Sequence, residues 1–251
     1  MNIYETDKQL AEYLLFHYGA PDEVLTHEGG PREALGYPAR CVSECLDVGL
    51  LPDKARALDL GCAVGRSTFE LARHCVEVIG IDFSRRFIDA AKVLRADGGL
   101  DYQRADEGAL TTPCRASVPP EIDRQRVAFE VGDAMNLRAG LGGFDVVLMA
   151  NLIDRLSEPR RCLDQLQTLL KPGGQLIITS PYTWLEEFTP RANWLGGFER
   201  DGLMTTTRAG LQAALAESFE LIATHDLPFL IREHARKYQW SVAEATIWRR
   251  L

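Results

Sequence analysis

The sequence ARALDLGCAVG, residues 55–65, decides the fold, because a short apolar run ends here in glycines and leads into the helical pattern RSTFELARHC. Gly61 and Gly65 let the backbone turn tightly and bring amide groups and a helix N-terminus against a ligand. A second strand-like run, VEVIGIDFS, follows at residues 76–84, and Ser84 is placed to cap a helix over 85–94. This order of strand, helix, strand and helix is typical of a parallel sheet.

The same alternation resumes after residue 126. Strand-like runs lie at 127–134, 144–153 and 175–182, and the pattern EPRRCLDQLQTLLKPGG predicts a helix that begins near Pro159 and is stopped by two glycines. The tail differs, because ELIATHDLPFLIRE and VAEATIWRR predict two strands close enough to pair antiparallel. We therefore expect an α/β fold with a mostly parallel sheet that is covered on both faces.

Two further segments complete the pattern. Near the N-terminus, TDKQLAEYLLFHYG has Thr6 and Gln9 at capping-box spacing and predicts a helix, and a second helix is expected around residues 39–48. The polar, proline-containing stretch 98–126 is interpreted as a long loop, either a surface excursion or a flap over a nucleoside site.

The composition, 46% hydrophobic and 25% charged, is that of an ordinary globular chain. We expect a single domain over residues 1–251, with a helical cap at 1–54 and, at 55–251, the sheet together with substrate-recognition elements at its C-terminal end. The net charge of −8 and the isoelectric point near 5.2 argue against nucleic acid as a partner. No apolar run approaches the length of a membrane span, and Glu5 and Asp7 occupy the place where a signal peptide carries positive charge. These features favour the cytoplasm and no membrane partner.

The six cysteines are scattered and none forms a CxxC pair, so the sequence predicts neither a metal site nor a disulfide scaffold. Cys41 and Cys45 share one helical face at a spacing of four residues, which is interpreted as packing.

Acidic residues follow the next two strands. Asp82 ends a strand about twenty residues after the glycine turn, where a carboxylate can accept both hydroxyls of a ribose. Asp133 follows the strand after that, where a side chain can meet an adenine edge. Because ligands of open α/β sheets bind at the carboxyl ends of the strands, the three strand ends together predict a nucleoside site.

The glycines indicate which nucleoside is bound. A dinucleotide fingerprint needs glycine at positions 61, 63 and 66, but Ala63 and the bulky Arg66 stand there, and no GKS or GKT follows for a P-loop. The spacing DxGxxxG, with acids ending the next two strands, resembles the class I S-adenosylmethionine (SAM)-dependent methyltransferases from about residue 55 to the end. Ala63 departs from the family's common middle glycine.

That resemblance implies a Rossmann-like, doubly wound, seven-stranded and mostly parallel sheet with an antiparallel C-terminal strand. It implies SAM as the cofactor and S-adenosylhomocysteine as the product. It also implies cofactor-binding roles, with Asn151 beside the methyl group, for Asp59, Gly61, Cys62, Ala63, Gly65, Asp82, Phe83, Asp133, Ala134 and Asn151.

A narrower resemblance covers almost the whole chain. The segments ANLIDRLSEP, LIITSPYTWLEEFTP, NWLGGF and FLIREHARKYQWSVAEATIWRR, with the leading YETDKQLAEYLLFHYG, are similar to the C-terminal methyltransferase domain of the ovothiol synthases. That resemblance implies N-methylation of the imidazole ring of 5-thiohistidine. The iron-dependent sulfoxide synthase portion of those enzymes has no counterpart here, so a separate sulfoxide synthase or a selenium-inserting enzyme would act upstream.

A small zwitterionic amino acid needs cations, an acid and flat apolar walls in its pocket. The basic and aromatic segment 229–240 offers such groups, and we expect it to close over the acceptor. Asn151 and Asp154 are the candidate catalytic residues, because either could hydrogen-bond the far ring nitrogen and select its tautomer. His17 and His234 are interpreted as structural. The expected substrate-binding residues, with Trp240 as a further wall, are Tyr18, Asp154, Tyr182, Trp184, Trp194, Arg232, Glu233, Arg236, Lys237 and Tyr238.

Three alternatives remain open at this stage. The acceptor could be selenohistidine, histidine or another small amine or thiol. A different class of function is a SAM-binding regulatory subunit without turnover. A nicotinamide oxidoreductase would require NADH binding, which the missing glycines disfavour.

Overall fold

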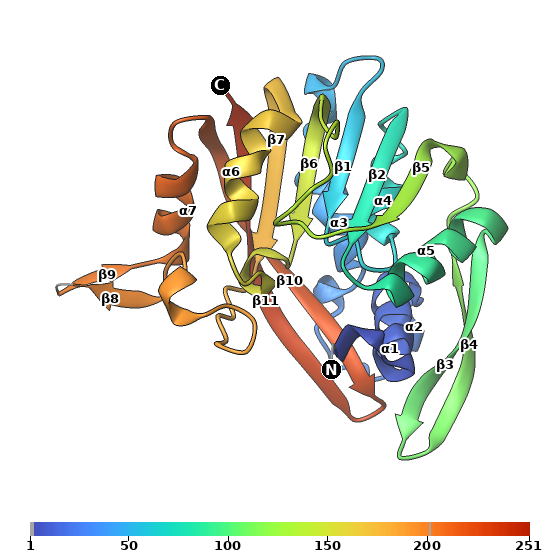
Figure 1. Ribbon diagram of the computed structural model, residues 1–251. Helices are drawn as coiled ribbons and strands as arrows, with labels where there is room; N and C mark the ends of the chain where they lie inside the picture. The colour runs from blue at the N-terminus through green and yellow to red at the C-terminus, as the bar shows by residue number, and fades with distance from the viewer. Residues whose placement is uncertain (1–2, 201) are drawn as a thin grey trace.

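The centre of the molecule is a seven-stranded sheet in the order β10-β11-β7-β6-β1-β2-β5 (Figure 1). The computed structural model describes residues 3–200 and 202–251. The sheet strands are β1 (Arg56–Leu60), β2 (Glu77–Asp82), β5 (Val127–Val131), β6 (Phe144–Ala150), β7 (Leu170–Ser180), β10 (Phe219–His234) and β11 (Lys237–Arg250). All neighbours from β7 to β5 pair parallel, whereas β11 runs antiparallel to both β7 and β10. The expected α/β fold of the class I methyltransferases is confirmed.

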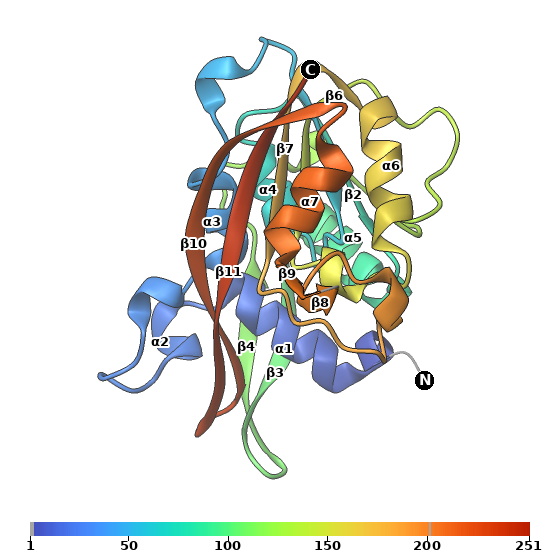
Figure 2. The same cartoon turned by 90° about the vertical axis from the view of Figure 1, so that its left-hand side faces the viewer.

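Helices cover both faces of this sheet, as a doubly wound arrangement requires (Figure 2). Alternate residues of the strands point to opposite faces, so Ala57 and Leu58 of β1 belong to two separate hydrophobic cores. One core includes residues of α1 (Asp7–Tyr18), α3 (Tyr37–Ser43), α4 (Arg66–Leu71) and α5 (Arg85–Asp97), and the other includes residues of α6 (Pro159–Leu169) and α7 (Thr207–Leu215).

Short elements connect this framework. They are η1 (Ile3–Glu5), α2 (Pro21–Val24), η2 (Arg32–Ala34), η3 (Val48–Leu50), η4 (Arg124–Arg126), η5 (Ile153–Arg155), η6 (Arg191–Asn193) and the hairpin of β8 (Phe198–Arg200) with β9 (Leu203–Thr205). In Figure 1, α1 lies below the ends of the parallel strands, so the N-terminal residues approach the carboxyl edge of the sheet.

The expected helix starts are confirmed by their capping hydrogen bonds. Thr6 Oγ1 accepts from the backbone N–H of Gln9 at 3.2 Å, and Ser84 Oγ accepts from the N–H of Phe87 at 3.1 Å. The end of α6 differs from the expectation. The helix stops at Leu169, before the two glycines, because Lys171 precedes a proline and the residue before a proline disfavours the helical conformation.

The expected long loop at 98–126 is wrong, because this stretch forms an antiparallel hairpin of β3 (Gly99–Glu107) and β4 (Leu110–Ser117). Tyr102, Cys114 and Ala116 are buried on its inner face, and most of the other side chains are charged, polar or exposed. The hairpin packs against α1 and the far end of β10, where the N–H of Ala235 donates to the carbonyl of Asp106 at 3.0 Å. It is therefore a supporting wall for α1.

All six cysteines are free thiols and are buried. Within residues 3–200 and 202–251, no three His, Cys, Asp or Glu side chains gather in a way that could hold a metal ion. No helix in the described part of the chain combines the length and the apolar character that crossing a membrane requires.

Candidate active site

A cavity of about 550 Å³ opens at the carboxyl ends of β1, β2, β5 and β6. Such strand ends are where open α/β sheets bind ligands. Its floor comes from the sheet, and its cover comes from η1, α1, α3 and the segment after β7. The residues that line it are Tyr4, Tyr13, Phe16, His17, Tyr37, Pro38, Asp59, Gly61, Cys62, Ala63, Ser67, Ile81, Asp82, Phe83, Ser84, Phe87, Gly132, Asp133, Ala134, Met135, Ala150, Asn151, Leu152, Arg155, Leu156, Ser157, Glu187, Phe188 and Ile231.

The glycine turn after β1 forms one side of the cavity. Gly61 and Gly65 have φ of +74° and +87°, in the left-handed region that favours glycine. A Cβ at Gly65 would lie 2.5 Å from Cζ of Phe129, so only glycine fits there. Ala63 also has positive φ, at +46°, and thus carries backbone strain that the family's common glycine avoids. Gly65 supports the turn but is not among the lining residues.

Asp59 is a buried acid at the end of β1. Its Oδ2 accepts from Thr68 Oγ1 at 2.7 Å, and burial raises the pKa of the carboxyl to about 7. The hydrogen bond from Thr68 opposes that rise, and the nearby charge of Asp82 adds to it. A cationic ligand group beside Asp59 would stabilise its ionised form.

Asp82, at the end of β2, is held by backbone amides from two loops. Its Oδ2 accepts from Ala63 N at 2.9 Å and its Oδ1 accepts from Ser84 N at 2.8 Å. Burial raises the pKa of Asp82 to about 6, although these backbone hydrogen bonds act in the opposite direction. Each carboxylate oxygen has two acceptor sites, so both oxygens can still accept from ligand hydroxyls.

Two residues complete the edge of this acidic side. Asp133 Oδ1 accepts from Met135 N at 2.8 Å, which fixes the turn after β5. Phe83 follows Asp82 and is 69% exposed at the cavity rim. An aromatic ring of that exposure beside an acid offers a flat surface on which a nucleobase can stack.

The opposite side of the cavity is a row of rings that we call the aromatic wall, formed by Tyr4, Tyr13, Phe16, His17 and Tyr37. Successive ring centroids lie 6.0 Å (Tyr4 to Tyr13), 6.4 Å (Tyr13 to Phe16) and 5.9 Å (Phe16 to Tyr37) apart. Burial, and after it the charge of Arg66, lowers the pKa of His17 to about 3, so its imidazole stays neutral.

The sequence interpretation gave the aromatic wall no role in binding, and it took His17 as structural. A usable signal was present, since Tyr13, Phe16 and His17 occur at helical spacing of three and four residues and thus share one face of α1.

Charged residues also reach the cavity from η5 and from the segment after β7. The guanidinium carbon of Arg155 lies 4.9 Å from the ring centroid of Phe188, and its Nη1 donates to the carbonyl of Thr183 at 2.9 Å. Glu187 lines the cavity beside them. This guanidinium and carboxylate, which the sequence interpretation did not name, could hold the two charged groups of a zwitterion.

Several residues expected at the substrate lie outside this cavity. Asp154 is fully buried behind it, where its Oδ2 accepts from Thr183 N at 2.9 Å and from Arg155 Nη1 at 3.2 Å. Burial raises the pKa of Asp154, and the nearby charge of Arg155 opposes the rise. Tyr18 supports the glycine turn from below, since its hydroxyl donates to the carbonyl of Val64 at 2.8 Å.

The expected tyrosine and tryptophan walls pack elsewhere. Tyr182 donates to Glu244 Oε2 at 2.7 Å. Trp184 and Trp194 stack on each other at 6.2 Å in the core under α6 and α7, and Trp184 Nε1 donates to Thr207 Oγ1 at 2.8 Å.

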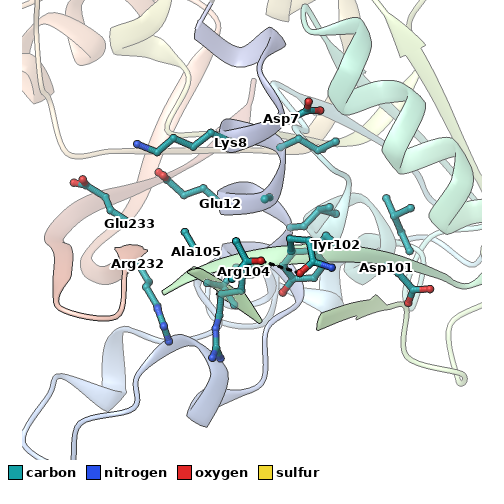
Figure 3. Close-up of a pocket in the computed structure, with 16 residues that line it drawn as sticks. Asp7, Lys8, Glu12, Asp101, Tyr102, Arg104, Ala105, Arg232 and Glu233 are labelled. Carbon is teal, nitrogen blue, oxygen red and sulfur yellow. Dashed lines mark hydrogen bonds between the residues drawn. The ribbon is translucent and has the colours of Figure 1, made fainter. Parts of the chain in front are cut away.

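The basic end of β10 and β11 lines a second cavity of about 450 Å³ (Figure 3). This cavity lies between β10, β3 and the outer face of α1, and Arg232 and Glu233 of β10 line it. Arg232 is buried and donates to Asp106 Oδ1 at 2.8 Å and to the carbonyl of Glu23 at 2.7 Å. Burial lowers the pKa of Arg232, and Arg104 beside it acts in the same direction.

The other residues of segment 229–240 that were expected to close over the acceptor lie near this second cavity or are exposed. Lys237 pairs with Glu233 at 2.7 Å, and the hydroxyl of Tyr238 donates to the carbonyl of Ala235 at 3.2 Å. Arg236 lies at the hairpin turn, and Trp240 is 54% exposed. The structure therefore does not bring these residues of segment 229–240 to the strand-end cavity, because α1 lies between that cavity and the second one.

Two family models match this chain, and both are described as a methyltransferase domain. One covers residues 58–176 and the other covers residues 121–248, just over half of the chain. Together they reach every strand of the sheet and include the glycine turn.

Curated relatives carry the same description. Ajmaline N-methyltransferase from Rauvolfia serpentina is 26% identical over 180 residues, which cover 69% of this chain and 53% of the relative. Magnesium-protoporphyrin O-methyltransferase from Rhodobacter capsulatus is 30% identical over 154 residues, or 57% of each chain. This chain spans about half the length of the curated relatives it matches.

A solved structure extends the likeness to nearly the whole molecule. The crystal structure of the (4+2)-cyclase SpnF has a TM-score of 0.60 and 18% sequence identity, and the match covers 98% of this chain and 94% of that chain. The fold is thus shared over nearly the whole chain. A solved SAM-dependent methyltransferase from Methanosarcina mazei shares it over 81% of this chain and 95% of that chain, with a TM-score of 0.52 and 19% identity.

Proposed function

Since this chain belongs to the methyltransferase-domain family and its fold is one that uses SAM, we propose that it methylates a nitrogen of a small, amino-acid-like acceptor. One observation carries the proposal: a single cavity joins the acidic strand ends to the aromatic wall, so cofactor and acceptor can lie side by side. A cavity of this size is suited to small molecules, for which pockets of about 300–1,000 Å³ are usual.

The residues of the acidic side fit SAM. The glycine turn brings Gly61, Cys62 and Ala63 to the cavity, and Asp59 offers a buried carboxylate to the methionine ammonium. Asp82 can accept from the ribose hydroxyls, and Asp133 with Ala134 can meet the adenine edge. When bound, SAM supplies an activated methyl group on a sulfonium.

The chain's own residues then have to orient the acceptor and exclude water. The aromatic wall presents flat, mostly apolar surfaces, against which a heteroaromatic ring can be held in one plane. Alignment of this kind can supply about 7–11 kcal/mol of barrier reduction. His17 is neutral at physiological pH, so it can accept a hydrogen bond from the acceptor without introducing a charge.

Arg155 and Glu187 support an acceptor that is a zwitterion. The guanidinium suits a carboxylate because its fork can donate two hydrogen bonds, and Glu187 suits an ammonium group. These two residues take over the function that the sequence interpretation gave to Arg232 and Glu233. The named relative that methylates a nitrogen, ajmaline N-methyltransferase, supports nitrogen as the atom that receives the methyl group.

The specific acceptor that we propose is the imidazole ring of 5-thiohistidine. Its support is the resemblance of the chain's segments to the ovothiol synthase methyltransferase domain, together with an aromatic and charged cavity that suits a ring bearing a zwitterionic tail. Selenohistidine or another small amine or thiol would use the same groups. A sulfur- or selenium-inserting enzyme would then supply the substrate.

The test is incubation of the purified protein with SAM and 5-thiohistidine, with selenohistidine and histidine in parallel, followed by product mass. We expect one added methyl on the thiolated or selenated ring and none on histidine. Methyl gain on another small amine alone would overturn the specific acceptor. If SAM binds by calorimetry but none of the three gains a methyl group, thiohistidine and selenohistidine are overturned as acceptors, and other small amines and thiols are the next to assay.

A further inference from the structure

Asn151 follows β6 and lines the cavity with an unusual backbone. Its φ is +51°, and its N–H donates to the carbonyl of Thr179 at 2.8 Å. A non-glycine residue at positive φ costs conformational energy and persists only where its surroundings hold it. Thr179 lies on the neighbouring strand β7, so the two strands together fix where the Asn151 side chain starts.

Tyr37 of α3 holds the other end of that side chain. Its hydroxyl donates to Asn151 Oδ1 at 2.7 Å and lies 2.7 Å from Thr179 Oγ1. Because the tyrosine has one proton and donates it to Asn151, the threonine hydroxyl is the donor to Tyr37. Tyr37 and Thr179 are both buried, and the Tyr37 ring is held by Phe229, with centroids 4.9 Å apart.

The direction of these hydrogen bonds determines what Asn151 offers to a ligand. In this arrangement Oδ1 accepts from Tyr37, and a reversed carboxamide would require Tyr37 to accept from Nδ2 and to donate to Thr179 instead. The other atom of the carboxamide, Nδ2, has no partner among residues 3–200 and 202–251. Since Asn151 lines the cavity, Nδ2 is a donor available to the bound acceptor.

We propose that Tyr37 is a positioning residue that fixes the Asn151 carboxamide, so that Nδ2 donates to a lone pair of the methyl acceptor. This inference rests on the proposed function and deepens it. It restricts the acceptor to molecules that present an unprotonated ring nitrogen, a thiolate or a carboxylate oxygen beside the atom that is methylated. An acceptor that presents only N–H groups on that side is disfavoured, because two donors would face each other.

A double-mutant cycle tests the coupling of the two residues. Tyr37→Phe keeps the ring and removes only the hydroxyl, and Asn151→Ala removes the carboxamide. We expect Tyr37→Phe to lower kcat for the acceptor by about tenfold while the Kd of SAM changes by less than about twofold. In the background of Asn151→Ala, Tyr37→Phe should then have no further effect. Multiplicative losses in the double variant would mean that Tyr37 acts independently, and would overturn the proposal.

A second measurement keeps the inference separate from the choice of acceptor. In a sample with 15N-labelled asparagine, the side-chain amide signal of Asn151 is the one that Asn151→Ala removes. We expect Tyr37→Phe to shift that signal, whereas Tyr102→Phe, a buried control in the β3–β4 hairpin, should leave it in place. An unchanged Asn151 signal in Tyr37→Phe would overturn the positioning role. Absence of any methylation by the wild type would instead overturn the proposed function, and the amide signal would still decide the role of Tyr37.

Discussion

Asp59 is an acid whose folded surroundings favour the protonated form. Because its pKa rises from the ordinary 3.8 to about 7, the folded chain keeps a proton over a pH range in which the unfolded chain releases it. Its contribution to the free energy of unfolding therefore falls as pH rises from about 4 to about 7, and is constant above that range. Bound SAM would reverse the effect, since an ammonium group beside the carboxylate favours the ionised form.

The variant Asp59→Asn tests this pH dependence, because asparagine mimics the protonated acid at every pH. Relative to the wild type, the free energy of unfolding of this variant should increase between pH 4 and pH 7 by up to about 4 kcal/mol, at about 1.36 kcal/mol per pKa unit. Its affinity for SAM should fall by about tenfold or more, because a charge-assisted contact is lost. Chemical denaturation at several pH values and calorimetry with SAM measure the two effects.

The outcome that contradicts this view is a stability difference between Asp59→Asn and wild type that does not depend on pH. Such a result would mean that Asp59 titrates at its ordinary pKa in the folded chain. A solvated Asp59 would also be a weaker partner for the cofactor.

Ala63 carries the strain of a left-handed backbone in the middle of the glycine turn, at φ +46°. Ala63→Gly should raise the free energy of unfolding by about 0.5–1 kcal/mol, because the relief of strain exceeds the added entropy of the unfolded chain. SAM affinity should stay within about threefold, since the turn keeps its shape. The matched control is Ala128→Gly in β5, where the backbone is extended and the same change should destabilise the protein. Equal destabilisation of both variants would show that the turn is unstrained.

At the scale of elements, α1 joins two environments. One face carries Tyr13 and His17 toward the strand-end cavity, and the other carries Lys8 and Glu12 toward the cavity of Figure 3. The helix has only 12 residues, so its stability depends on its cap and on packing more than on intrinsic propensity.

Loss of the N-terminal cap of α1 should therefore loosen the cover of the active-site cavity. Thr6→Ala should destabilise the helix by about 1 kcal/mol. We expect faster hydrogen exchange across residues 7–18 and faster release of SAM. The control is Thr206→Ala, which removes the equivalent cap of α7, where Thr206 Oγ1 accepts from Ala209 N at 3.2 Å, away from the cavity. If both variants release SAM equally fast, α1 does not act as the cover.

The β3–β4 hairpin was expected to be a loop because its strands give a weak sequence signal. The β3–β4 hairpin buries alternate residues on one face, such as Tyr102 and Cys114, and its other face carries exposed polar and charged residues such as Asp101 and Arg115. A run of this kind has no continuous apolar signal, and Pro113 within β4 lowers the strand signal further. Strands β1, β2, β6 and β7 of the central sheet are buried on both faces over most of their length, so they carry a continuous apolar signal.

Across the whole molecule, the sequence predicted the positions of side chains at the ends of sheet strands better than those of side chains that other elements bring to the site. Asp59, Asp82 and Asp133 reach one cavity because parallel strands end at the same edge. The position of Arg232 could not be read in this way. Its place depends on how far β10 and β11 extend beyond the sheet and on which side of α1 their tip lies, and both are tertiary features.

Arg155 and Arg232 lie in different environments, and we therefore expect different roles for them. Arg155 reaches the active-site cavity, whereas Arg232 is buried in a cluster with Asp106 and the carbonyl of Glu23, which joins β10, β3 and α2. Arg155 is thus expected to act on the acceptor, and Arg232 on the cohesion of the fold. Replacement of each by lysine keeps the charge and removes the planar fork.

Arg155→Lys should raise the KM of the acceptor by about tenfold or more, because a charge-assisted hydrogen bond to a carboxylate is worth about 1.5–3 kcal/mol. Its free energy of unfolding should fall by less than that of Arg232→Lys, because a lysine can keep a hydrogen bond to Asp154 or to the carbonyl of Thr183. Arg232→Lys should lower the free energy of unfolding by about 1–3 kcal/mol, since a buried hydrogen bond is lost, while the KM measured well below the melting temperature stays at the wild-type value. Steady-state kinetics and thermal unfolding of both variants measure the two quantities together. The reverse pattern, with Arg232→Lys raising KM and Arg155→Lys only lowering stability, would return the acceptor to the end of the β10–β11 hairpin, and α1 would then have to move aside for the acceptor to meet SAM.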